Sequence, residues 1–292
     1  MPKQRKKQPQ LVLIGDDTNP SVSRAMGAFT RWVANKADIL AQFGLENGDN
    51  AVLRQSDFAV VFGGDGSIIS TARSLCRAKV PVIGVNLGKL GYLAEFSLAE
   101  LKRLFDTIVA HETRIEKRML LSCRIYRRTD NPKRLPHFQA TAANDVFVTA
   151  GPPFRATELA VSVDGQRVAS CVSDGLIVST PTGSTAYNLS AGGPLLAASM
   201  KAMVLTPICP HSLSFRPLVL NAHSLVEIVG VRVNDGTTVS IDGQLSIPLT
   251  EEDVVQISKA RGDFLVVNNP LRNSWDTLAT KLGWAMPPKY ER

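Results

Sequence analysis

The first part of the chain alternates short apolar runs with stretches of helical spacing. Leu11–Ile14, Phe58–Phe62 and Val80–Val85 are nearly continuous apolar runs, a pattern typical of strands buried on both faces. Helical spacing of apolar residues follows Ser21 and recurs over Leu98–Ile115. Strands that alternate with helices predict a parallel sheet with helices on its faces.

The pattern changes near Glu116, where helical spacing almost disappears. Short runs such as Leu159–Val163 alternate apolar with polar residues, as expected for strands with one buried face. Asp164-Gly165 and Asn234-Asp235-Gly236 predict the tight turns of two hairpins. This region is therefore predicted to be an antiparallel β domain, and helical spacing returns only over Asn273–Trp284.

The predicted fold class is an α/β N-terminal domain with a parallel sheet plus an all-β, sandwich-like C-terminal domain. Four segments follow from the pattern. Residues 1–10 form a disordered basic tail, and residues 11–116 form the α/β domain. Residues 117–270 form the antiparallel β domain, and residues 271–292 form a C-terminal segment that packs back on the α/β domain.

Composition narrows the class of protein. The 292 residues carry a net charge of +7, and four of those charges come from the basic residues between Lys3 and Lys7. A short basic tail favours a solvated end over a nucleic-acid-binding surface. The four cysteines form no Cys-x-x-Cys pair, which argues against a zinc site or a disulfide framework. No stretch approaches a signal sequence or a membrane span, so we expect a cytoplasmic protein with no nucleic-acid or membrane partner.

The strongest chemical signal is the turn Gly63-Gly64-Asp65-Gly66-Ser67, between the strand Phe58–Phe62 and a helical stripe that begins at Ile68. A glycine turn at a helix start points backbone N–H groups and a positive helix end at an anion, typically a phosphate. A carboxylate beside a phosphate has a use if it binds Mg²⁺ or accepts a proton from an attacking hydroxyl. The alternative is a plain Asp-Gly turn between core elements.

Three further stretches favour ligand binding. Asn144-Asp145 places an amide beside a carboxylate, as hydroxyl-rich ligands require. Small and hydroxyl-bearing residues fill Ser173–Gly193, where they let a ligand approach the backbone closely. Leu205–Pro217 contains three prolines and His211, for which a structural role is favoured over action on a ligand because the sequence gives it no partner.

These motifs, in this order, resemble those of the bacterial NAD kinases. The resemblance covers nearly the whole chain from Leu11. The glycine turn alone is shared with phosphofructokinases and with diacylglycerol and sphingosine kinases. Asn144-Asp145, Thr180–Asn188 and Pro210–Ser214 are the parts specific to the NAD kinase pattern.

The resemblance implies transfer of a phosphoryl group to the 2′-hydroxyl of the adenosine ribose of NAD, which gives NADP. ATP with Mg²⁺ is the implied donor, or polyphosphate in some members, and the metal is carried by ATP rather than by a protein site. Asp65 is the implied catalytic base. The implied NAD-binding residues are Asp65, Gly66, Asn144, Asp145, Arg155, Asp174, Thr182, Thr185, Ala186, Tyr187, Asn188, Leu189, Ser190 and Gln244. The implied phosphate-binding loop is Gly63, Gly64, Gly66 and Ser67. Family members are usually homodimers or homotetramers whose sites are completed across subunits.

Two positions depart from the family pattern. Val172 stands where many relatives carry an arginine, which bears on the choice between NAD and NADH. Gly15-Asp16-Asp17 replaces a first loop that is often Gly-His-Pro, which bears on the choice of donor. Two alternatives keep the same layout: a lipid kinase of the diacylglycerol kinase type, and a non-catalytic nucleotide sensor. The NAD-type motifs disfavour the first, and Asp65 disfavours the second because binding alone needs no base.

Overall fold

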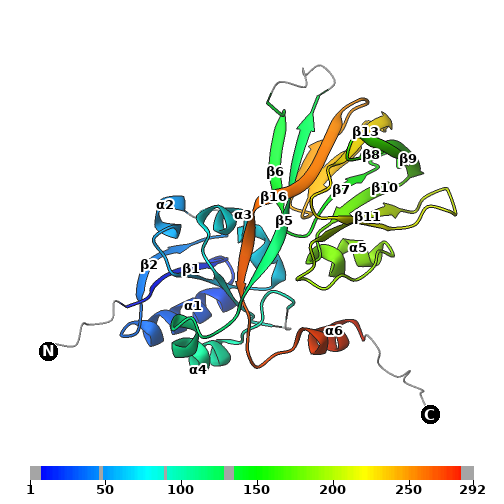
Figure 1. The fold of residues 1–292 in the computed structure, drawn as a ribbon. Coiled ribbons are helices and arrows are strands. Elements are labelled where there is room, and N and C mark those ends of the chain that lie inside the picture. Colours follow the sequence, from blue (N-terminus) through cyan, green and yellow to red (C-terminus); the bar gives the residue numbers. More distant parts are fainter. Residues whose placement is uncertain (1–7, 46–48, 89–90, 128–134, 284–292) are drawn as a thin grey trace, which may run out of the picture. The chain divides into compact units, whose positions relative to one another are not determined.

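The computed structural model describes residues 8–45, 49–88, 91–127 and 135–283. The chain divides into two compact units (Figure 1). Unit 1 comprises residues 1–116 and 265–292, and unit 2 comprises residues 117–264.

Unit 1 is built on a parallel sheet of four strands in the order β2-β1-β3-β4. The strands are β1 (Gln10–Gly15), β2 (Asp38–Phe43), β3 (Phe58–Phe62) and β4 (Val82–Val85). The end of β16 (Val254–Val267) adds a further parallel pairing, between Val266 and Val82. β1 and β3 run in register up to Gly15 and Phe62, so the loops that follow both strands leave the same edge of the sheet.

Helices cover both faces of this sheet. The helices of unit 1 are α1 (Pro20–Val33), α2 (Asn50–Leu53), α3 (Asp65–Ala78), α4 (Leu98–Val109) and α6 (Ser274–Leu282). α1 and α4 share one core with alternate residues of the strands, and its aromatic centre includes Phe29, Phe62 and Phe105. α3 packs on the opposite face, where a Cβ at Gly84 would lie 2.4 Å from the side chain of Ile68.

Unit 2 is a sandwich of antiparallel strands around a single apolar cluster. One sheet has the order β16-β13-β8-β9, with β5 paired to β16 and β6 paired to β5. The other has the order β12-β11-β10-β7-β14-β15. The strands are β5 (Ile115–Tyr126), β6 (Phe138–Ala142), β7 (Asp145–Thr149), β8 (Thr157–Val163), β9 (Gln166–Ser173), β10 (Gly175–Ser179), β11 (Ala202–Ile208), β12 (Leu218–Asn221), β13 (Val226–Arg232), β14 (Thr238–Ile241) and β15 (Leu245–Pro248). The short helices η1 (Gly183–Thr185) and α5 (Tyr187–Ser190) follow β10.

The predicted fold class is confirmed, but one predicted hairpin is wrong. Asp164-Gly165 joins the hairpin β8–β9, as expected. β13 and β14 instead belong to different sheets, so Asn234–Gly236 crosses the sandwich. Asp164 and Gly165 both have the positive φ of a tight hairpin turn. Gly236 does not; it packs against Gly151, whose added Cβ would lie 1.9 Å from the Gly236 carbonyl oxygen. This packing of one backbone on another overrides the local turn signal.

Two predicted boundaries also change. The helix predicted over Leu98–Ile115 ends at Val109, and Ile115 already begins β5. The predicted tail 1–10 extends too far, because Gln10 pairs with Asp38 in β1 and donates its backbone N–H to Asp57. Residues 1–7 of that tail and Trp284 of the predicted last helix lie outside the described residues. Strand β2 was not predicted, because its residues are only partly buried at the edge of the sheet.

None of the described helices is long and apolar enough to cross a membrane.

Candidate functional site

The glycine turn opens helix α3 without a side-chain cap. Gly64 is the N-cap residue, and no side chain there accepts a hydrogen bond from the first turn. Gly63 has φ 151°, and a Cβ at this position would lie 2.3 Å from Ser67 Oγ, so only glycine fits. Gly64 and Gly66 are exposed, with open space where a Cβ would stand. A helix start that has no side-chain cap and carries glycines on its exposed side suits an anion such as phosphate.

The carboxylate of Asp65, the first residue of α3, is held by a loop of the same unit. Asp65 Oδ2 accepts the backbone N–H of Tyr92 at 2.8 Å. Asp65 Oδ1 accepts those of Leu93 and Ala94 at 2.9 and 3.0 Å. A Cβ at Gly91 would lie 1.9 Å from Asp65 Oδ1, so this loop approaches the carboxylate as closely as a glycine allows. Three hydrogen bonds fix the orientation of Asp65 and leave its outer face toward solvent, since about a third of the side chain (32%) is exposed.

Helix α6 brings a cation to the same carboxylate. Lys281 Nζ lies 3.6 Å from Asp65 Oδ2 and 5.0 Å from the centre of the Tyr92 ring. Burial, and then the negative charge of Asp65, raise the pKa of the Tyr92 phenol. Asp65, Tyr92 and Lys281 therefore form one cluster of charged and polar groups at the start of α3.

A second loop, in unit 2, is held in the same way by Asp242. Its carboxylate accepts the backbone N–H groups of three consecutive residues: Ala143 at 2.9 Å, Asn144 at 2.7 Å and Asp145 at 3.2 Å. Asp242 and Gly243 form the β14–β15 turn, with φ 54° and 65°. The Asn144-Asp145 pair is thus positioned by a residue almost a hundred positions away in the chain.

Asp145 itself is buried, with 3% of its surface exposed. Burial, and then the neighbouring charge of Asp242, raise the pKa of Asp145 from 3.8 to about 7. The carboxyl group therefore changes its protonation state close to neutral pH.

The run of small residues after β10 packs on the backbone of the same loop. Thr180 donates its backbone N–H to the Asn144 carbonyl at 2.8 Å and its hydroxyl to the Ala143 carbonyl at 2.7 Å. A Cβ at Gly183 would lie 2.1 Å from the Asn144 carbonyl oxygen. Thr180 therefore ties the segment to this loop through two hydrogen bonds. Position 183 needs glycine, because the chain there passes too close to Asn144 for a side chain.

Tyr187 lies at the exposed side of this segment. Its ring meets Phe147 edge-on, with 5.0 Å between ring centres. Burial, and then the charges of Cys209, Asp145 and Asp174, raise the pKa of the Tyr187 phenol. The phenol therefore lies near both predicted carboxylates of unit 2, and 37% of the residue remains exposed to a ligand.

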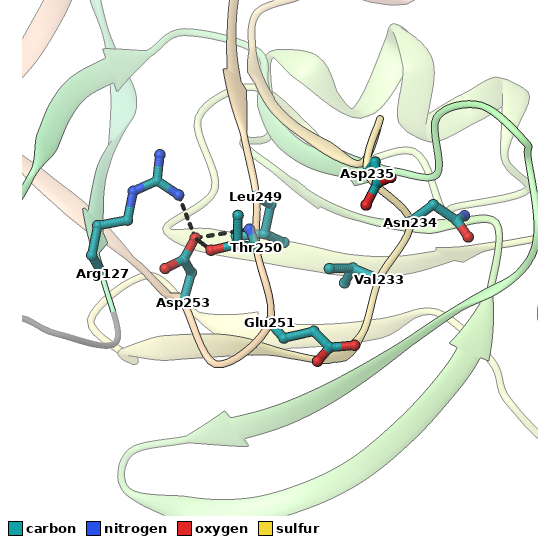
Figure 2. A pocket seen from close by; sticks show the side chains of 8 residues that line it. All are labelled: Arg127, Val233, Asn234, Asp235, Leu249, Thr250, Glu251 and Asp253. Atoms are coloured by element: carbon teal, nitrogen blue, oxygen red, sulfur yellow. Dashed lines mark hydrogen bonds and ion pairs between the residues drawn. The ribbon is translucent and has the colours of Figure 1, made fainter.

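The remaining polar predictions in unit 2 lie at the surface. Asp174, Arg155 and Gln244 are exposed. The carbonyl oxygen of Arg155 accepts a hydrogen bond from the Asn234 amide at 2.5 Å. Asn234 also lines a cavity with Asp235, Thr250 and Glu251, beside the ion pair of Arg127 with Asp253 (Figure 2). None of the predicted site residues lines this cavity.

Comparisons with known proteins decide the family. Residues 12–113 match the family model of the ATP-NAD kinase N-terminal domain, and residues 143–269 match that of the C-terminal domain. The NAD kinase of Syntrophotalea carbinolica is 39% identical over 228 residues, which cover 78% of each chain. That of Rhodopirellula baltica is 33% identical over 280 residues, or 95% of this chain and 87% of that protein.

The chain belongs to the NAD kinase family. Family membership makes the chain a phosphotransferase that converts NAD to NADP, and it supports ATP as the phosphoryl donor. Among solved structures, yeast NADH kinase in complex with NADH superposes with a TM-score of 0.87 at 25% identity, covering 99% of this chain and 91% of that one. An NAD kinase from Archaeoglobus fulgidus in complex with ATP, at 23% identity and a TM-score of 0.74, shares the fold.

The predicted site residues fall into two groups, one in each unit. Gly63, Gly64, Asp65, Gly66 and Ser67 share the turn before α3. The structure gathers Asn144, Asp145 and the segment from Thr182 to Ser190 around one loop of unit 2.

The side chain of Asn188, one of the residues predicted to bind NAD, makes its hydrogen bonds inside the protein. It is fully buried. The amide donates to the Ser184 and Pro194 carbonyls, and its oxygen accepts from Thr206 Oγ1 at 2.6 Å. Both amide donors and the amide oxygen are therefore used inside the protein, so this side chain holds the segment in place. A role of Asn188 in NAD binding stays a prediction.

Sequence reasoning missed two charged residues that contact predicted ones. Asp242 is one of them, although the pair Asp242-Gly243 signals a turn whose carboxylate can bond backbone N–H groups. Lys281 belongs to no motif, and only the fold brings it to Asp65.

The residues at the glycine turn fit a metal ion that arrives with its nucleotide. Among the residues that the structure describes, no group of three or more His, Cys, Asp and Glu side chains could hold a metal. Mg²⁺ is usually bound through one or two carboxylates together with substrate phosphates. Asp65 keeps an exposed face beside the open helix start and suits that arrangement.

Replacing Asp145 with asparagine is expected to stabilise the protein at alkaline pH. An acid with a raised pKa in the folded state contributes most stability when protonated, and that contribution is lost as pH rises from about 3.8 to about 7. The neutral amide avoids the loss, which is worth at most about 4 kcal/mol for such a shift. Thermal unfolding at pH 5 and pH 8 measures it: the variant should gain on the wild type between these values. An equal difference at both pH values would contradict the raised pKa.

Proposed function

We propose that the chain transfers the terminal phosphoryl group of ATP to the 2′-hydroxyl of the adenosine ribose of NAD, with Asp65 as general base. The observation that carries this proposal is the carboxylate fixed at an uncapped helix start between exposed glycines. A ribose hydroxyl is a weak nucleophile at neutral pH, and a positioned base that accepts its proton typically gives about 10²–10⁴-fold in rate. The three backbone hydrogen bonds hold Asp65 in one orientation for that transfer.

The glycine turn is the proposed phosphate site. Phosphoryl transfer depends on positioning and charge stabilisation more than on covalent chemistry. Gly64 and Gly66 leave room for phosphate oxygens to approach the backbone, and Ser67 adds a hydroxyl in the first turn of α3. Mg²⁺ bound with ATP would neutralise phosphate charge at this point. The same residues would accept polyphosphate by the same chemistry.

Unit 2 supplies the proposed NAD-binding groups. The backbone of Asn144 is occupied by Asp242 and Thr180, so its side chain is what this loop offers to a ligand. Tyr187 offers a partly exposed ring, and Asp174, Gln244 and Arg155 offer exposed polar groups. The remaining proposed contacts come from the small-residue segment: Thr182, Thr185, Ala186, Leu189 and Ser190.

We also propose a homo-oligomer. β12 is an edge strand of its sheet and exposes Leu218 and Val219, and the preceding loop exposes Leu213 at 89%. An edge strand with exposed apolar side chains favours pairing with another chain.

Product analysis tests the proposed reaction. Purified protein with NAD or NADH, ATP or polyphosphate, and Mg²⁺ should yield the 2′-phosphorylated dinucleotide, with ATP as an effective donor. The yields from NAD and NADH give the selectivity between the two dinucleotides, and the same assay on Val172→Arg shows the effect of Val172, which lies in β9 and accepts the backbone N–H of His211. Folded protein that phosphorylates a diacylglycerol but neither dinucleotide would refute the proposal.

Replacing Asn144 with alanine should raise the KM for NAD by about tenfold or more, because a hydrogen bond to a polar ligand is lost. The KM for ATP should change little, since the backbone of the loop stays bound to Asp242 and Thr180. Steady-state kinetics with each substrate varied in turn measures both values. Gln166→Ala, which removes an exposed amide from the β8–β9 hairpin, is the matched control. Equal KM values for NAD in both variants would remove Asn144 from the site.

A further inference from the structure

We propose that Lys281, in the last turn of helix α6, binds the phosphates of the donor nucleotide at the glycine turn. This role rests on the proposed function of that turn. The sequence motifs assign only glycines, Ser67 and one carboxylate to this phosphate site. Lys281 adds a cation from the C-terminal segment.

The charge at this edge of the sheet favours a cation from the protein in addition to the Mg²⁺ that arrives with ATP. Asp65 stands in the first turn of α3. Asp16 and Asp17 follow β1, which runs beside β3 in register and ends at the same edge of the sheet. Asp16 is turned toward Thr18, whose N–H and hydroxyl it accepts at 3.0 and 2.6 Å. A polyphosphate that approaches this edge meets negative charge, and the backbone N–H groups of one helix start carry only a fraction of a positive charge.

Lys281 reaches this edge with an ammonium group that makes no close hydrogen bond to Asp65. Its Nζ lies 3.6 Å from Asp65 Oδ2, farther than the 2.7–2.9 Å typical of a charged hydrogen bond. The Tyr92 ring supports the ammonium at 5.0 Å without using a hydrogen-bond donor. Among the described residues, the buried Tyr92 hydroxyl has no hydrogen-bond partner. An ammonium with uncommitted donors beside an unsatisfied hydroxyl suits a site that an anionic, oxygen-rich ligand completes.

Hydrogen bonds at the start of α6 hold this helix so that Lys281 lies at the glycine turn. Arg272, just before the helix, donates to both carboxylate oxygens of Glu100 at 2.9 Å and to the Glu95 carbonyl at 2.7 Å. Asn269 donates its backbone N–H to the Glu95 carboxylate at 2.8 Å. Asn273 then caps the helix by accepting the N–H of Trp275. The start of α6 is therefore tied to the segment that begins α4, and Lys281 lies about two turns farther along.

The proposed role involves no covalent step. Without nucleotide, the ammonium pairs with Asp65. When a triphosphate occupies the glycine turn, Lys281 donates to phosphate oxygens, which carry more charge than the single carboxylate.

The test compares Lys281→Met, Lys281→Arg and Lys36→Met in the full-length protein. Lys36 is a matched control, because it also pairs with a carboxylate (Asp106, 3.8 Å) and lies over a ring (Trp32, 4.5 Å). Calorimetric titration with Mg-ATP should show about tenfold or more weaker binding for Lys281→Met, partial recovery for Lys281→Arg and no change for Lys36→Met. The KM for ATP should rise in parallel, whereas the KM for NAD stays within about twofold.

The inference is overturned if Lys281→Met binds Mg-ATP as tightly as the Lys36→Met control. It is also overturned if Lys281→Met raises the KM values for ATP and NAD equally while lowering the melting temperature, since that result describes a residue that only holds α6 in place. Failure of the proposed function looks different: wild-type protein would bind Mg-ATP yet form no NADP, and the binding comparison would still decide the role of Lys281.

Discussion

Replacing Asp65 with asparagine is expected to lower turnover by about 10²-fold or more while NAD and Mg-ATP still bind. The amide cannot accept the proton of the ribose hydroxyl. It also carries no charge beside Lys281, which lies 3.6 Å from the carboxylate. Single-turnover kinetics with saturating substrates measures the chemical step, and titration of each substrate measures binding.

The same substitution should also lower the melting temperature. Asparagine can keep the bonds from Leu93 and Ala94 through its oxygen, but its NH₂ group then faces the backbone N–H of Tyr92. Two donors in contact cost one hydrogen bond and leave a backbone group unsatisfied. Loss of stability alone therefore does not prove a catalytic role.

Asp253→Asn is the control that separates the two effects. The Asp253 carboxylate accepts the backbone N–H and the hydroxyl of Thr250 and pairs with Arg127 beside a cavity that no predicted site residue lines (Figure 2). Both variants should melt at lower temperatures, and only Asp65→Asn should lose turnover at a temperature where both are folded. Near-normal turnover in a folded Asp65→Asn protein would leave Asp65 as a residue that only fixes the 92–94 loop. Recovery of turnover with added Mg²⁺ would favour metal binding over proton acceptance.

Local sequence predicted those parts of the fold and site that neighbouring residues determine. The apolar run Phe58–Phe62 and the glycines after it specify a buried strand, a turn and a helix start with no help from distant residues. Asp164-Gly165 likewise specifies its hairpin through two residues that tolerate positive φ. The same reasoning failed at Asn234–Gly236, because the contact of Gly236 with Gly151 depends on tertiary packing.

The parts of the site that could not be predicted are side-chain contacts across long sequence separations. Asp242 reaches back to residues 143–145, and Lys281 reaches back to Asp65. Neither residue differs in type from many exposed acids and lysines in the chain. Asn188 shows the converse: it stands inside a motif, but its amide is buried and bonds to the protein itself, which the motif does not reveal. A motif identifies which segment meets the ligand, and packing decides which side chains of that segment do so.

Asp242 and Asp65 share one arrangement: a single carboxylate accepts three consecutive backbone N–H groups and so fixes a loop. The loop fixed by Asp242 carries the predicted site residues Asn144 and Asp145. Replacing Asp242 with alanine removes all three acceptors, each worth about 1.5–3 kcal/mol when bonded to a charged group. It also places alanine at φ 54°, which an asparagine tolerates better. We therefore expect the stability order wild type, Asp242→Asn, Asp242→Ala.

The KM for NAD should rise by about tenfold or more in Asp242→Ala and less in Asp242→Asn, because the loop that carries Asn144 and Asp145 loses its anchor, whereas the KM for ATP stays nearly constant. Both variants also remove a negative charge that raises the pKa of Asp145, so the pH dependence of NAD binding should move to lower pH.

Asp164→Asn is the matched control. It changes the other Asp-Gly hairpin turn, where Asp164 and Gly165 have φ 52° and 78°, and the Asp164 carboxylate accepts the N–H of Leu225 instead. If Asp164→Asn and Asp242→Asn shift the KM for NAD and its pH dependence equally, the effect belongs to turn stability, and Asp242 has no specific role in positioning Asn144 and Asp145.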